Sequence, residues 1–229
     1  MHLLVTDRLS CPRCGPTFGL ILMADDLRDR RVLEGALGCA NCRERYPVRG
    51  GFGDLRPPPR GPLPEFGMSD SVRVGGGSSP VPDAPVEHST SPDDPAEAAF
   101  RLAALLGVRE GPGLILLAGG WASLAGRLAA RIDEIEVVAL DPALHGAGEE
   151  AGVSRLTAGA GLPFFSSALR GVALEGAQLA EWEGEAIRVL APGARLVVRD
   201  PPPGLSSRLE ARGLQPLLET RRYVVAQRG

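Results

Sequence analysis

The chain has 229 residues, a formal net charge of −3 and 44% hydrophobic residues, values typical of a globular protein. The slight negative charge gives no overall attraction to DNA or to an acidic membrane surface, so neither is expected as a partner. The N-terminus lacks a charged start followed by a long apolar core, and no later run approaches the roughly 20 apolar residues that span a bilayer. We therefore expect a cytoplasmic protein.

Four cysteines form two C-x-x-C pairs near the N-terminus, Cys11-Pro-Arg-Cys14 and Cys39-Ala-Asn-Cys42. Two intervening residues let both thiolates of a pair bind one metal ion, and two such pairs complete a tetrahedral Zn²⁺ shell. Because a closed shell leaves no position for water, the spacing predicts a structural zinc ion. A redox-active pair or unrelated buried thiols are the alternatives. The stretch between the pairs, which includes Ile21, Leu22 and Val32, is expected to form a short hairpin.

The flanking residues carry a resemblance. Leu-x-x-x-x-Leu-x-Cys-Pro-x-Cys at residues 4–14, and Tyr46-Pro-Val-Arg-Gly-Gly51 after the second pair, resemble the zinc-ribbon proteins that activate tRNA, ribosomal-RNA and release-factor methyltransferases. The chain departs from them at Phe52-Gly53, where the family has Ile-Pro. The resemblance covers residues 1–56 and implies a ribbon with an RNA or protein partner from the translation machinery.

Residues 57–94 read as a flexible linker. This segment is rich in Pro, Gly and Ser and has almost no apolar periodicity. Proline removes hydrogen-bond donors and glycine raises the entropic cost of ordering, so this stretch is expected to act as a tether.

From residue 95 onward, apolar segments of helical and strand character alternate, which predicts an α/β fold with a Rossmann-like parallel sheet over residues 95–229. The helices are expected at 96–108, 122–132, 177–190 and 205–212. The parallel strands are expected at 113–118, 135–140, 154–157, 171–174 and 194–199, with a closing pair of strands within 214–227.

A strand, a glycine turn, a helix and a second strand ending at Asp141 form the layout of a nucleotide cradle. The turn at Ala118, Gly119 and Gly120 lets a ligand approach the backbone, and the Asp141 carboxylate can accept hydrogen bonds from ribose hydroxyls. By itself this layout is also a common tight connection in α/β proteins.

Three further stretches resemble class I S-adenosylmethionine-dependent methyltransferases: Glu185-Ala-Ile-Arg-Val-Leu-Ala-Pro-Gly, Leu162-Pro-Phe164 and Leu209-Glu-Ala-Arg-Gly-Leu214. The resemblance implies S-adenosylmethionine as cofactor, held by Ala118, Gly119, Gly120 and Asp141. The family's Asp-x-Gly-x-Gly-x-Gly stretch falls on residues 116–122, where one of three glycines remains, Leu116 replaces the acid and Trp121 adds bulk at the turn.

For catalysis the resemblance points to Glu175, at the end of the fourth strand, where such enzymes often place a polar residue. An ordinary exposed loop glutamate is the alternative. Two functions remain open: a methyltransferase acting on RNA or protein of the translation machinery, and a non-catalytic pseudo-methyltransferase that serves as a zinc-dependent binding or adaptor module.

Overall fold

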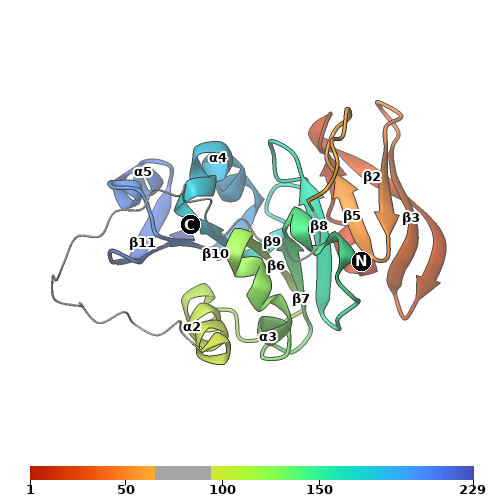
Figure 1. The fold of residues 1–229 in the computed structure, drawn as a ribbon. Helices are drawn as coiled ribbons and strands as arrows, with labels where there is room; N and C mark the ends of the chain where they lie inside the picture. Colours follow the sequence, from red (N-terminus) through yellow and green to blue (C-terminus); the bar gives the residue numbers. More distant parts are fainter. Residues whose placement is uncertain (65–93) are drawn as a thin grey trace, which may run out of the picture.

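The computed structural model describes residues 1–64 and 94–229; most of the expected linker, residues 65–93, lies outside the described residues. Figure 1 shows the arrangement of the elements. The helices are α1 (Leu3–Thr6), α2 (Pro95–Leu106), α3 (Ala125–Ala129), α4 (Leu179–Val189) and α5 (Leu205–Ala211). The strands are β1 (Ser10–Cys11), β2 (Gly15–Arg28), β3 (Arg31–Cys39), β4 (Arg45–Arg49), β5 (Phe52–Leu55), β6 (Gly113–Ala118), β7 (Ile135–Leu140), β8 (Val153–Ala158), β9 (Leu169–Glu175), β10 (Leu190–Arg199), β11 (Leu214–Glu219) and β12 (Tyr223–Arg228).

All these strands belong to one twelve-stranded sheet in the order β1-β2-β3-β4-β5-β8-β7-β6-β9-β10-β12-β11. The central strands β8, β7, β6, β9 and β10 are parallel. Their order in the sheet is that of a doubly wound Rossmann-like sheet. An antiparallel pair, β12 and β11, completes that edge. The expected α/β architecture and the closing pair of strands are confirmed.

The N-terminal strands continue the same sheet. β5 pairs in parallel with β8, with Phe52 opposite Arg155 and Leu55 opposite Ala158. The division into a ribbon (1–56), a linker (57–94) and a methyltransferase-like part (95–229) stays a prediction. The pairing nevertheless means that residues 1–55 are hydrogen-bonded to the second part, and not only tethered to it.

Helices cover both faces of the parallel strands, with α2 and α3 on one face and α4 and α5 on the other (Figure 1). Each face has its own hydrophobic cluster. Leu102 of α2 and Leu128 of α3 belong to one cluster, and Ala186 of α4 and Leu209 of α5 belong to the other. The buried strands between them are almost continuously apolar, as expected for a parallel sheet covered on both faces.

The N-terminal segment packs on the α4–α5 face. Met1, Val5 and Leu9 are fully buried in the same cluster as Leu116 and Val138 of the central strands. In the connection from β8 to β9, which is described throughout, no helix is assigned; an isolated bridge joins Leu9 to Phe164 there. The N-terminal segment therefore supplies apolar cover that a connecting helix gives in other doubly wound sheets.

A buried polar network crosses the same junction. Arg155 of β8 is 3% exposed and donates to the Gly50 carbonyl oxygen at 2.7 Å and to the Glu149 carboxylate at 2.7 Å. Arg31 of β3 donates to Glu149 at 2.7 Å and to Glu136 at 3.2 Å. Because buried charges are costly unless they are paired, these contacts specify how the two parts fit together.

Two expected elements differ from the structure. The helix expected at 122–132 is a 3₁₀ turn over Gly119–Leu124 followed by the short α3, because Trp121 points inward and donates its indole N–H to the Leu174 carbonyl oxygen at 3.1 Å. The short hairpin expected between the cysteine pairs is a long one, β2 and β3. None of the described helices is long and apolar enough to cross a membrane.

Candidate functional site

The four cysteine side chains meet at the end of the N-terminal hairpin. Cys11 ends β1, Cys39 ends β3, and Cys14 and Cys42 lie in the turns that follow. All four Sγ atoms lie within 4.8 Å of one another; Cys11 and Cys42 are 3.7 Å apart, and Cys14 and Cys39 are 3.8 Å apart.

These separations fit a metal ion. A regular tetrahedron with metal–sulfur distances of about 2.3 Å has corners about 3.8 Å apart, whereas a disulfide brings its two sulfurs to about 2.05 Å. The four cysteines are free thiols in the structure. The predicted ligand set is therefore brought together in a geometry compatible with tetrahedral coordination.

Tyr46 and Asn41 surround the sulfur cluster. The Tyr46 hydroxyl lies 3.5 Å from the Cys11 sulfur, and the Asn41 amide donates to the Cys14 sulfur at 3.3 Å. Tyr46 is fully buried in the core shared with the central strands, and this burial raises the pKa of its hydroxyl. The outer shell of the cluster is thus continuous with the main core.

The predicted cofactor turn follows β6. Gly119 has a φ of +62°, a left-handed conformation that favours glycine. Side chains from elsewhere in the chain cover the turn at Gly119 and Gly120. An added Cβ at Gly120 would lie 2.6 Å from Nη2 of Arg199 and 2.7 Å from Oε1 of Glu175, and one at Gly119 would lie 2.9 Å from the Gln178 amide.

Glu175, the predicted catalytic residue, is one of these covering groups. Its carboxylate is ion-paired with Arg199, at the end of β10, and accepts from the backbone N–H of Gln178. The Gln178 side chain in turn accepts from the backbone N–H of Glu175 at 3.0 Å. The side chain is about two-thirds buried at the end of β9, and a catalytic role for Glu175 and an ordinary structural one both stay predictions.

Trp121 does not add bulk to the open face of the turn, contrary to the expectation from sequence. It is 3% exposed and belongs to the hydrophobic cluster beneath α2 and α3. The Arg199 guanidinium lies 4.5 Å from the centre of its ring. Access to the turn is therefore restricted by Glu175, Gln178 and Arg199, and not by the tryptophan.

A cavity of about 310 Å³ opens beside the turn, at the carboxyl ends of β6, β7 and β8. Two of the four predicted cofactor residues, Gly119 and Asp141, line it; Ala118 ends β6 next to it, and Gly120 lines a different cleft. Thr157, Gln178 and Trp182 complete much of its wall. Its volume is at the lower end of the range for small-molecule pockets.

Groups in this cavity could engage a ligand. One Asp141 carboxylate oxygen accepts from the Ala143 backbone N–H at 2.8 Å, which caps the following turn. The indole Nε1 of Trp182 is buried and has no hydrogen-bond partner in the described part of the chain. The turn at Gly119 and Gly120, by contrast, is already covered by Glu175, Gln178 and Arg199.

Residues after the N-terminal strands close one side of the cavity. Arg56 and Pro64 line it, and Arg56 is held by a bidentate ion pair with Asp54 of β5, at 2.8 and 2.9 Å. Burial raises the pKa of Asp54, but the hydrogen bonds from Arg56 outweigh it and the pKa is lowered. The N-terminal part of the chain thus contributes a fixed cation to the candidate site.

Two of the three methyltransferase-like stretches, at 162–164 and from Glu185, contact each other. Arg188 donates to the carbonyl oxygens of Leu162 and Phe164 at 2.8 and 2.6 Å, and Glu185 accepts from the Leu162 backbone N–H at 3.2 Å. Glu185 and Arg188 are themselves ion-paired at 2.7 Å. These residues fix the connection between β8 and β9.

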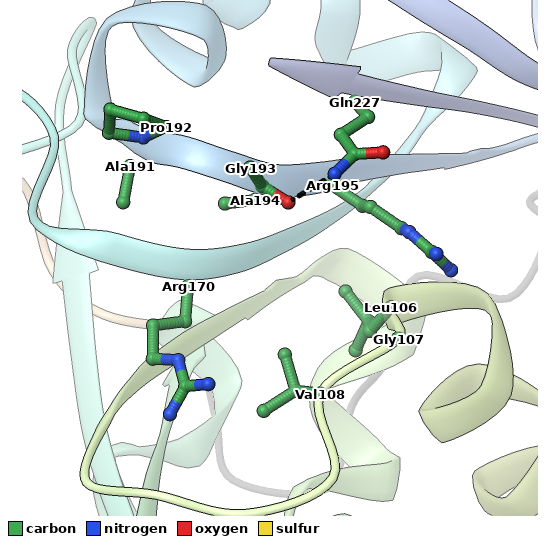
Figure 2. A pocket seen from close by; sticks show the side chains of 10 residues that line it. All are labelled: Leu106, Gly107, Val108, Arg170, Ala191, Pro192, Gly193, Ala194, Arg195 and Gln227. Atoms are coloured by element: carbon green, nitrogen blue, oxygen red, sulfur yellow. Dashed lines mark hydrogen bonds between the residues drawn. The ribbon is translucent and has the colours of Figure 1, made fainter. Parts of the chain in front are cut away.

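A second cavity of about 310 Å³ lies at the opposite end of the strands (Figure 2). Arg170 and Arg195 line it, and the Gln227 amide bonds to the Gly193 carbonyl oxygen at 2.9 Å. It contains none of the predicted site residues. In open α/β sheets ligands bind outside the carboxyl ends of the strands, so this cavity is not the candidate site.

Sequence reasoning missed Arg199, Gln178, Trp182 and Arg56. The Glu175-x-x-Gln178 spacing is a capping-box pattern and could have revealed Gln178. No local signal marked Arg199, because its contact with the glycine turn depends on the neighbouring strand order.

No protein-family model matches the chain, and no curated protein sequence matches it. Solved structures with a similar fold include the (4+2)-cyclase SpnF, with 19% identity and a TM-score of 0.43 over 54% of this chain and 58% of that chain. This chain therefore spans less than two thirds of that cyclase. A geranyl diphosphate methyltransferase in complex with SAM has 17% identity and a TM-score of 0.41, over 58% of this chain and 85% of that chain.

The tRNA methyltransferase TrmI from Aquifex aeolicus has 12% identity and a TM-score of 0.40 over 62% of this chain and 71% of that chain. Scores this low carry no argument about activity. The chemistry proposed below rests on this chain's own residues.

Proposed function

We propose that the protein is methyltransferase-like and binds S-adenosylmethionine, or a related adenosine ligand, in the cavity beside Asp141. One observation carries this proposal: Gly119 and Asp141, which follow the neighbouring strands β6 and β7, line the same cavity. The Asp141 carboxylate would accept hydrogen bonds from the ribose hydroxyls in the cavity that Gly119 borders.

A thermal-shift titration with S-adenosylhomocysteine tests this proposal, because a ligand that binds only the folded state raises the melting temperature by mass action. We expect a shift in the wild type, no shift in Asp141→Ala, and an unchanged shift in the exposed control Asp133→Ala. Because Asp141→Ala also removes the hydrogen bond from the Ala143 N–H, its shift is measured from its own ligand-free melting temperature. No shift in the wild type at high micromolar ligand would end the proposal.

We further propose that the four cysteines hold a structural Zn²⁺ ion. The sulfur separations and the closed set of four thiols support zinc over a redox pair. Metal analysis of the purified protein is expected to find about one zinc per chain, lost in the double variant Cys39→Ser and Cys42→Ser.

The second candidate is a non-catalytic pseudo-methyltransferase that acts as a binding or adaptor module. The ion pair between Glu175 and Arg199 favours it, because it covers Gly120, where the family resemblance places the cofactor. Incubation with radiolabelled S-adenosylmethionine and ribosomal extracts separates the two candidates. Label transferred to RNA or protein would establish the enzyme, and binding of S-adenosylhomocysteine without any transfer would favour the adaptor.

For the partner we propose RNA or protein of the translation machinery, and for the location the cytoplasm. The partner rests on the resemblance of residues 1–56 to methyltransferase-activating zinc ribbons. Pairing of β5 with β8 is consistent with that resemblance, because it places the ribbon directly against the methyltransferase-like sheet.

A further inference from the structure

A second cleft lies on the other side of the glycine turn and has a different chemical character. Its volume is about 420 Å³. It is bordered by Gly120 after β6, by Arg199 at the end of β10 and by Tyr223 at the start of β12. β12 is antiparallel to β10, so the start of β12 lies beside the end of β10, and all three positions lie at the carboxyl ends of the parallel strands. Open α/β sheets bind ligands at this end.

The cleft is strongly cationic. Three of its lining residues are arginines, Arg127, Arg199 and Arg222, and none is an acid. Glu175 neutralises part of the charge of Arg199 from outside the cleft. Arg127, on α3, is exposed at the rim. The chain as a whole has a net charge of −3, whereas this cleft attracts anions.

Two aromatic rings hold the arginines in place. The Arg199 guanidinium lies 4.5 Å from the Trp121 ring centre, and the Arg222 guanidinium lies 5.6 Å from the Tyr223 ring centre. The two rings are 6.2 Å apart. A guanidinium that lies over a ring donates from its edge, and Arg199 already uses part of that edge for Glu175.

We propose that this cleft binds single-stranded RNA, with phosphates on the arginines and a base against the partly buried Tyr223. The shared ligand chemistry is a phosphate anion. The combination of guanidinium planes and aromatic rings favours RNA over a phosphopeptide, because unstacked bases bind on such planar groups. This inference rests on the proposed function and deepens it, since it names RNA as the partner class and gives the partner a site separate from the Asp141 cavity.

The test measures binding of a fluorescently labelled single-stranded RNA of about twelve nucleotides, within the usual site size for single-strand binding, by anisotropy at several salt concentrations. The wild type is compared with Arg127→Glu, Arg127→Lys and the control Arg109→Glu. Arg109 is also exposed, but it lies between α2 and β6, at the opposite end of the strands. Both Glu variants change the net charge equally, so they differ only in where the charge is changed.

We expect Arg127→Glu to weaken RNA binding at least tenfold, Arg127→Lys to keep most of it, and Arg109→Glu to change it less than twofold. The slope of log affinity against log salt concentration is expected to be smaller in Arg127→Glu, by the amount that corresponds to about one phosphate contact. Equal weakening by the two Glu variants, or no RNA binding by the wild type at low salt, would overturn the proposal.

A phosphoserine peptide and inorganic phosphate serve as competitors. Competition by the peptide at the same concentration as unlabelled RNA would assign the cleft to phosphoproteins and would also overturn the RNA proposal. The S-adenosylhomocysteine shift is measured on the same variants. Arg127→Glu is expected to keep it, so that loss of RNA binding and failure of the cofactor proposal are separate results.

Discussion

The carboxylate of Glu175 and the guanidinium of Arg199 form an ion pair that lies against Gly120. The two residues end the neighbouring parallel strands β9 and β10, where they are directly opposite each other in the register. The pair covers one part of the cofactor site suggested by sequence and leaves the part beside Asp141 open. Glu175 can therefore have one of two roles: its carboxylate either limits access to the turn or contacts the ligand.

If Glu175 limits access to the turn, Glu175→Ala will bind S-adenosylhomocysteine more tightly than the wild type. We expect roughly a fivefold gain, because opening a partly exposed ion pair costs about 1 kcal/mol. Isothermal titration calorimetry measures it, with Glu181→Ala, an exposed residue of α4, as the control. Weaker binding in Glu175→Ala would instead indicate that the carboxylate contacts the ligand.

Removal of the metal is expected to destabilise the whole protein. Tyr46 and Leu55 of the N-terminal strands belong to the same hydrophobic cluster as Leu116 and Leu156, so loss of the cysteine cluster loosens a core shared with the central strands. Thermal unfolding of the Cys39→Ser and Cys42→Ser double variant, followed by circular dichroism, is expected to show one transition at a lower temperature. Two transitions, one of them unchanged, would mean that the parts fold independently.

The double variant also tests what the cysteine-bearing segment contributes beyond stability. If RNA or protein partners still bind to the folded fraction after zinc loss, the segment is structural support. Loss of partner binding at a temperature where the parallel sheet is still folded would assign it a direct role.

The buried network between the two parts is expected to be essential for stability. Arg155→Met leaves the Glu149 carboxylate without one of its two arginine partners and the Gly50 carbonyl oxygen without its donor. Breaking a buried pair in this way costs about 3–5 kcal/mol. Urea unfolding measures the loss, and Arg49→Met, at an exposed position of β4, is expected to change stability by less than about 0.5 kcal/mol.

Acid is expected to weaken the contact that holds the connection after β8. Hydrogen bonds from Arg188 lower the pKa of Glu185 below its ordinary value of 4.5. A carboxylate with a lowered folded-state pKa stabilises the fold above its unfolded pKa, and this contribution is lost as the pH falls through the folded-state pKa.

Glu185→Gln is therefore expected to lower the melting temperature at pH 7, and its difference from the wild type should shrink as the pH falls below 4.5. Glu181→Gln, on the exposed side of the same helix, serves as control. A difference that is constant between pH 7 and pH 3 would contradict the assignment.

Strand positions were the most predictable features of this chain. The strands at 113–118 and 135–140 agree with the structure to the residue, because each is a short apolar run ended by glycine or aspartate. The four cysteines were equally predictable, since C-x-x-C spacing brings two thiols to one point through local geometry alone. The 3₁₀ turn after β6 was not, because it depends on the contact of Trp121 with Leu174, a residue 53 positions away.

The sequence by itself determined the cysteine set, the alternation of strands and helices, and the positions of Gly119 and Asp141, because these depend on local spacing and periodicity. Only the tertiary structure decided that β5 pairs with β8, that Glu175 and Arg199 cover the glycine turn, and that three distant arginines border one cleft. Those contacts join residues far apart in the chain, and their partners are chosen by strand order and burial, which no local pattern encodes.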